Sequence, residues 1–150
     1  MKPTRRRKGI ESGRATVTYL ISEPFESSVK SVREVLAKEH LRVPLELDVT
    51  AGIRKELGVG LAPCRVLFVD CPVLLLEAVT LDSSVAAILP LHVALAGYGP
   101  QTRVHLISSS GAFNVNLPPA TFTAVGRLQA RVVRALEKIA SRQGVCELVP

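Results

Sequence analysis

Residues 63–98 read PCRVLFVDCPVLLLEAVTLDSSVAAILPLHVALAGY, and no other part of the chain is apolar over such a length. A transmembrane helix needs about 20 consecutive apolar residues. Acidic side chains and the helix-breaking Pro72 and Pro90 interrupt this stretch well before that length is reached. We therefore interpret it as the core of a folded domain.

The stretch divides into a strand, a helix and a second strand. Arg65–Asp70 lacks polar alternation, which is typical of a strand covered on both faces, and we expect it to be central in a sheet. Asp70 offers a side-chain acceptor, and Pro72 a preset φ, for the start of a helix that runs to about Leu81. The second strand is expected after Pro90.

Two strand–helix units are expected before this core. They are a strand at Ala15–Ile21, a helix from Phe25 to about His40, a strand at Val43–Val49 and a two-turn helix ending at Gly58. Pro44 favours an edge position for the second strand, and Asp48 is the expected N-cap of the second helix. Alternation turns Leu45 and Leu47 to one side of that strand and Glu46 to water on the other.

A hairpin is expected after the core helix, because His92–Ala96 and Thr102–Ser108 flank the turn sequence GYGPQ. Symmetry about Gly99 and Pro100 places three polar side chains on one face: His92, Arg103 and His105. It places four apolar side chains on the other face: Val93, Leu95, Val104 and Leu106.

The last expected element is a helix over Thr121–Arg142, which Gly144 would end. Its apolar positions recur every three or four residues, and cations line its opposite side. These cations are Arg127, Arg131, Arg134, Lys138 and Arg142.

The chain has 150 residues, 47% of them hydrophobic, and a formal net charge of +6. We divide it into a disordered basic arm at 1–14, an α+β domain at 15–109, a linker at 110–119 and a basic amphipathic helix with its tail at 120–150. The expected fold is two-layer α+β, a mixed sheet of about five strands backed by helices. Its order is strand-helix-strand-helix-strand-helix-strand-strand, followed by the C-terminal helix.

Three cysteines, Cys64, Cys71 and Cys146, form neither a C-x-x-C pair nor an even set. We therefore expect neither a disulfide framework nor a zinc site. The arginines near the start are not followed by the apolar segment of a signal peptide. A cytoplasmic protein is the expectation, and no nucleotide or hydrolase motif predicts a cofactor or a reaction.

Five short motifs carry a resemblance to a known family. They are YLISEPF at 19–25, LELDV at 45–49, KELGV at 55–59, PCRVL at 63–67 and ILP at 88–90. In order and spacing they resemble the bacterial and archaeal family called domain of unknown function 302, over about residues 17–108. The resemblance implies a compact α+β domain with a mixed sheet, a tendency to form homodimers, and no established catalytic residues. The chain departs from the family pattern at Asp70-Cys71-Pro72 and Pro90-Leu91-His92.

Four side chains are candidates for a ligand site: Cys71, His92, Arg103 and His105. Cys71 could be a reactive thiol, because a helix N-terminus lowers the pKa of a cysteine, but a buried structural thiol is favoured. The two histidines with Arg103 could hold a metal or an anion, but a solvated or dimer-facing sheet surface is favoured. Glu46 and Asp48 could act as paired carboxylates, against the favoured roles of a water-facing side chain and a helix cap.

The cations of the last helix could contact nucleic acid or an anionic membrane, assisted by the arm residues Arg5, Arg6, Arg7 and Lys8. A solvated helix face explains them equally well. Our main expectation is a non-enzymatic, homodimeric module that binds a ligand or a protein. The alternatives are nucleic-acid binding, and a small enzyme or thiol-dependent sensor that uses Cys71 and His92.

Overall fold

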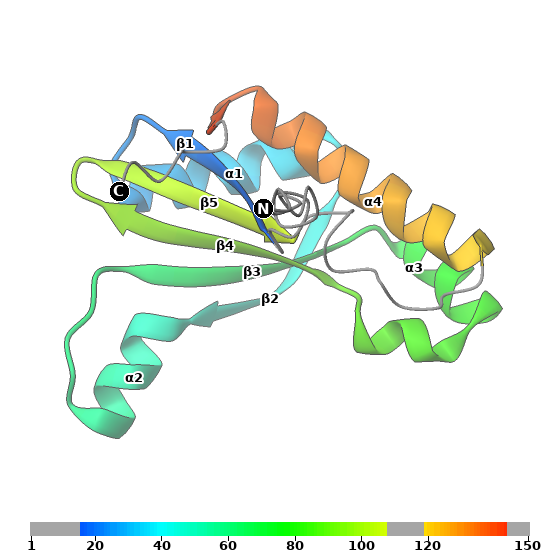
Figure 1. The fold of residues 1–150 in the computed structure, drawn as a ribbon, viewed down its shortest axis with the longest axis horizontal. Helices are drawn as coiled ribbons and strands as arrows, with labels where there is room; N and C mark the ends of the chain where they lie inside the picture. The colour runs from blue at the N-terminus through cyan, green and yellow to red at the C-terminus, as the bar shows by residue number, and fades with distance from the viewer. Residues whose placement is uncertain (1–15, 108–118, 144–150) are drawn as a thin grey trace, which may run out of the picture.

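The apolar run that dominates the sequence supplies two neighbouring strands of a single sheet (Figure 1). The computed structural model describes residues 16–107 and 119–143. Its strands are β1 (Thr16–Ile21), β2 (Arg42–Asp48), β3 (Cys64–Asp70), β4 (Leu91–Tyr98), β5 (Gln101–Ile107) and β6 (Ser141–Arg142). They lie in the order β2-β3-β4-β5-β1-β6, and every pair is antiparallel. The sheet is therefore antiparallel rather than mixed, and β6 adds a strand to the expected five.

The helical segments are α1 (Phe25–Lys38), α2 (Val49–Leu57), α3 (Pro72–Leu81), the short 3-10 helix η2 (Ser83–Ala87) and α4 (Pro119–Glu137). Helices α1, α3 and α4 lie on one side of this sheet, and α3 reaches the common core beyond the ends of the strands, where it packs against α4 (Figure 1). Helix α4 packs against both α1 and α3, and α1 packs against β4 and β5. Helix α2 packs against β3 and projects beyond the ends of β2 and β3, at the far end of the molecule from α3 (Figure 1). None of the helices in the described ranges is long and apolar enough to cross a membrane.

The core lies between the sheet and these helices. The hairpin register is the expected one, with Val93 opposite Leu106 and Leu95 opposite Val104, and all four side chains are buried. The other fully buried large side chains come from β1, β3 and the helices: Tyr19, Ile21, Leu67, Val69, Val29, Val32, Leu36, Val85, Leu128 and Leu136. One continuous hydrophobic cluster thus joins β1, β3, β4 and β5 to α1, α3 and α4.

The edge strand β2 turns polar side chains toward the helices and apolar side chains away from them. As expected, β2 is at the edge, and Asp48 caps α2 by accepting a hydrogen bond from the Ala51 amide at 2.9 Å. Glu46, however, does not face water alone: it pairs with Arg33 of α1 and Arg65 of β3 on the helix side. The apolar side of β2 is the one turned away from the helices.

Two expectations around β3 are corrected. This strand has neighbours on both edges, but helices cover only one of its faces, and Val66 and Phe68 on the other face are only half-buried. Asp70 does not cap α3, because its carboxylate accepts from Arg42 at 2.5 Å. The N-cap of α3 is Cys71, whose side chain makes no capping hydrogen bond, and Pro72 occupies the first turn as expected.

The C-terminal helix is shorter than its periodicity suggested. It ends at Glu137, and Ser141–Arg142 pairs with β1 as strand β6, so Lys138 and Arg142 lie beyond the helix. The sequence had set residues 120–150 apart from the α+β domain, yet Leu128 and Leu136 of α4 are fully buried in the common core.

Leu128→Ala tests this placement of α4. We expect the free energy of unfolding to fall by about 2–5 kcal/mol, because the substitution leaves a cavity in a closely packed core. Urea denaturation followed by circular dichroism measures the change. The matched control is Arg127→Ala, whose side chain is mostly exposed, and it should have a far smaller effect. Equal effects of the two substitutions would show that α4 does not share the core.

Candidate functional site on the open sheet face

The face of the sheet turned away from α1, α3 and α4 carries the candidate site, and we call it the open face. Strand alternation and register place on it two groups of side chains with different chemistry. The apolar half comprises Leu45, Leu47, Val66 and Phe68 of β2 and β3. The polar half comprises Thr18, His92, Arg103 and His105 of β1, β4 and β5.

The apolar half is unusually accessible for its composition. The exposed fractions of Leu45 and Leu47 are 60% and 51%. Register places them opposite Phe68 and Val66 respectively, so the four side chains form one contiguous patch. The exposed Leu57, Val59 and Leu61 follow in α2 and the loop after it.

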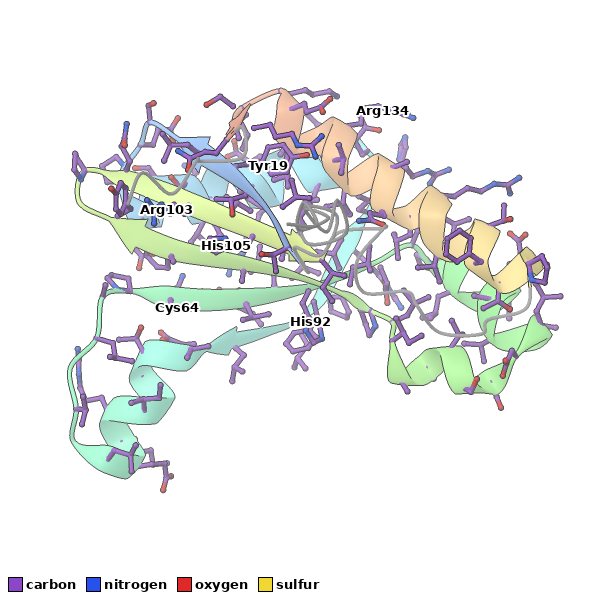
Figure 2. The ribbon with its side chains drawn as sticks, viewed as in Figure 1. Tyr19, Cys64, His92, Arg103, His105 and Arg134 are labelled. Atoms are coloured by element: carbon purple, nitrogen blue, oxygen red, sulfur yellow. The ribbon has the colours of Figure 1, made fainter. Side chains whose placement is uncertain are left out.

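In the polar half, Arg103 has an aromatic partner. Its guanidinium carbon lies 3.6 Å from the centre of the Tyr98 ring, a cation–π contact near the hairpin turn (Figure 2). The Nε of Arg103 is buried without a hydrogen-bond partner. None of the ion pairs among the described residues includes Arg103.

His105 lies next to Arg103 on the same face of β5. Its Nδ1 is 2.9 Å from the Thr18 hydroxyl, which fixes the ring through one nitrogen. Burial, and secondarily the neighbouring Arg103 guanidinium, lower the pKa of His105 below its ordinary value. The structure therefore brings together Arg103 and His105, as the sequence predicted, and adds Thr18 and Tyr98 to them.

His92 lies apart from this pair. Its ring meets the Phe68 ring edge-on, with the centroids 4.7 Å apart, at the opposite end of β4 from Tyr98 (Figure 2). On β4 the residues directly opposite His105 and Arg103 are Ala94 and Ala96, not His92. Within the described ranges no three His, Cys, Asp or Glu residues are grouped as metal ligands would be.

Cys71 lies on the helix side of the sheet. It is buried, and Nη1 of Arg131 in α4 approaches its sulfur at 3.5 Å. His92 is exposed on the open face, so the structure does not bring together the two residues of the thiol hypothesis. Cys146 falls outside the described residues.

The basic side of α4 is largely engaged by carboxylates of neighbouring helices. Glu39 pairs with Lys138 at 2.8 Å and with Arg134 at 3.9 Å, and its pKa is lowered chiefly by the hydrogen bond from Lys138. Arg127 lies 4.0 Å from Glu77 of α3. These pairs reduce the free positive charge available to a polyanion. The arm cations Arg5, Arg6, Arg7 and Lys8 fall outside the described residues.

Sequence analysis missed Tyr98 and Thr18, although the expected hairpin held a signal for the first. Tyr98 pairs with Gln101 next to the turn. Because Gln101 is two residues before Arg103 on β5, Tyr98, Gln101 and Arg103 share one face. Thr18 is brought to His105 by the pairing of β1 with β5 across most of the chain length. No local sequence pattern predicts a contact between residues so far apart in the chain.

The lowered pKa of His105 predicts a pH dependence of stability. Protonation then favours the unfolded chain, so the free energy of unfolding falls as pH decreases from about 6.5 through the lower pKa of the folded state. His105→Gln should remove this part of the dependence. Urea denaturation at a series of pH values from neutral to mildly acidic compares the two proteins. Identical pH profiles would contradict the assigned environment of His105.

Burial of Cys71 predicts slow alkylation. In the folded protein we expect its thiol to react with iodoacetamide much more slowly than in urea, because the reagent must reach a covered sulfur. Mass spectrometry of the modified peptides at neutral pH gives both rates. Equal rates in the folded and unfolded protein would overturn the structural role and restore the reactive-thiol hypothesis.

Comparisons with known proteins agree with the resemblance seen in the sequence. The family model described as "Domain of unknown function DUF302" matches residues 17–139, which extends the similarity through α4. No curated protein matches the chain. The crystal structure of an uncharacterized conserved DUF302 protein from Bacillus stearothermophilus has a TM-score of 0.76 at 16% identity and covers 85% of this chain and 99% of its own, so it shares the fold. Because the family model spans most of its length, this chain belongs to the DUF302 family.

Proposed function

We propose that this protein is a cytoplasmic, non-enzymatic binding module that works as a homodimer, with two copies meeting through their open faces. The observation that carries the proposal is the exposure of Leu45 and Leu47 beside Val66 and Phe68. An antiparallel sheet that faces water on one side normally presents polar side chains there. An apolar patch in that position indicates a protein partner.

A second copy fits this patch better than an unrelated surface would. In a two-fold symmetric dimer the same patch meets itself, so an apolar surface is automatically complementary to its partner. Two sheets can pack face to face at a separation of about 10 Å with their side chains interdigitated. Leu57, Val59 and Leu61, on α2 and its following loop, extend the exposed apolar surface beyond the strands.

Helix α3 offers a competing surface. Its apolar sequence predicts a helix that one sheet face cannot cover, and the structure supplies α4 as a second covering element. Val73 and Leu76 nevertheless stay 73% and 70% exposed. We favour the open face because its patch spans two paired strands and continues into α2, whereas the exposed apolar side chains of α3, which are Val73, Leu76 and Leu81, come from one helix.

The paired substitution Leu45→Glu/Leu47→Glu tests the proposal. We expect wild type to sediment as a dimer and the variant as a monomer, because four glutamates would face one another across the symmetric interface. Both leucines are largely exposed in the single chain, so the fold should tolerate the change. Sedimentation velocity over a dilution series, with circular dichroism to confirm folding, gives the result.

Val73→Glu/Leu76→Glu is the matched control, since it places two glutamates on the other exposed apolar surface. This variant should remain dimeric. A monomeric wild type would refute the homodimer. A dimer that only the α3 variant dissociates would show that the copies meet through α3 instead.

A further inference from the structure

We propose that the polar half of the open face binds an organic carboxylate, with its head group on Arg103 and His105 and its apolar body along Ala94 and Ala96. This inference deepens the proposed function by assigning a ligand class to the binding module. It stands on the side chains of a single chain and does not require the partner copy to supply a residue.

The first step is the charge of Arg103. A guanidinium stays protonated at any pH the folded protein meets. Its cross-strand neighbours, Leu20 on β1 and Ala96 on β4, are uncharged, and no ion pair in the described part of the chain neutralises it. Tyr98 stacks on the flat side of the group, which leaves its edge for a ligand. A carboxylate matches that edge through two parallel hydrogen bonds.

His105 supplies a second polar contact beside this cation. The Thr18 hydroxyl engages Nδ1, so the other ring nitrogen, Nε2, is left for a ligand. The lowered pKa of His105 favours its neutral form, so Arg103 supplies the positive charge of this pair. A single positive charge matches a monoanion such as a carboxylate better than a phosphate dianion.

The surroundings of the pair indicate an apolar body on the ligand. Directly across β4, Ala94 and Ala96 have the smallest side chains of any chiral residue, and beyond them β3 places Val66 opposite Ala94. A chain leaving the head group in this direction passes these small apolar side chains before it reaches the apolar half, where the partner copy would lie. Burial of methylene groups along Ala94 and Ala96 adds affinity that a short acid cannot gain.

The experiment compares acetate with octanoate on the full chain. Arg103 provides its own reporter, because its side-chain Nε–H gives a resolved signal in ¹H–¹⁵N spectra when it is buried. We expect octanoate to shift this signal and to bind at least about tenfold more tightly than acetate. Arg103→Gln should weaken octanoate binding, measured by calorimetry, about tenfold or more.

The matched control is Arg54→Gln, which removes the same charge from the exposed surface of α2. It should leave octanoate binding unchanged. His105→Gln provides a second variant of the site and should also weaken binding. Equal octanoate affinities of the Arg103 and Arg54 variants, or equal affinities of wild type for acetate and octanoate, would overturn the inference.

Sedimentation of the same samples separates this inference from the proposed function. Wild type that is monomeric but binds octanoate through Arg103 would refute only the homodimer. Wild type that is dimeric but indifferent to octanoate would refute only the carboxylate site.

Discussion

The structure depends on the burial of one face of one sheet. Leu67 of β3, Val93 and Leu95 of β4 and Val104 of β5 form an inward-facing aliphatic layer with no exposed surface. This layer can be covered only by helices that lie on the same side, where α1 packs against the strands, α4 packs against α1, and α3 packs against α4. Among the described residues, no long helix therefore covers the opposite face of the sheet. The exposed leucines of β2 and the position of Arg103 on the open face are consequences of that one-sided arrangement.

Several charged side chains connect the elements of the fold. Asp70 is almost completely buried and accepts two hydrogen bonds from Arg42, which secures the edge strand to β3. Glu39, at the end of α1, engages the last turn of α4. A row of cations that looked like a nucleic-acid surface in the sequence thus acts in good part as a connection between helices. Arg103 is the contrasting case, because an aromatic ring is its partner instead of a carboxylate.

Local patterns predicted most of the fold. Alternation located the strands, Asp48 and Gly58 bounded α2 as expected, and the hairpin register followed from its turn. The failures come from long-range pairing. The sequence around Asp70 does not indicate that its carboxylate accepts a hydrogen bond from Arg42. The sequence around Arg142 does not indicate that this residue pairs with β1 in a strand. Likewise, alternation predicted that His92 and His105 share a face. It did not predict how far apart they lie along the strands, which depends on register.

The central claim is that two copies meet through their open faces, and photo-crosslinking tests it most directly. A benzophenone amino acid placed at Leu47 should give a covalent dimer on irradiation, and the same probe at Leu76 on α3 should not, because only the first position would face the partner copy. Mass spectrometry of the crosslinked peptides should then locate the partner attachment on β2, β3 or α2. A covalent dimer that forms only with the probe at position 76 would contradict the account. So would the absence of a covalent dimer with either probe.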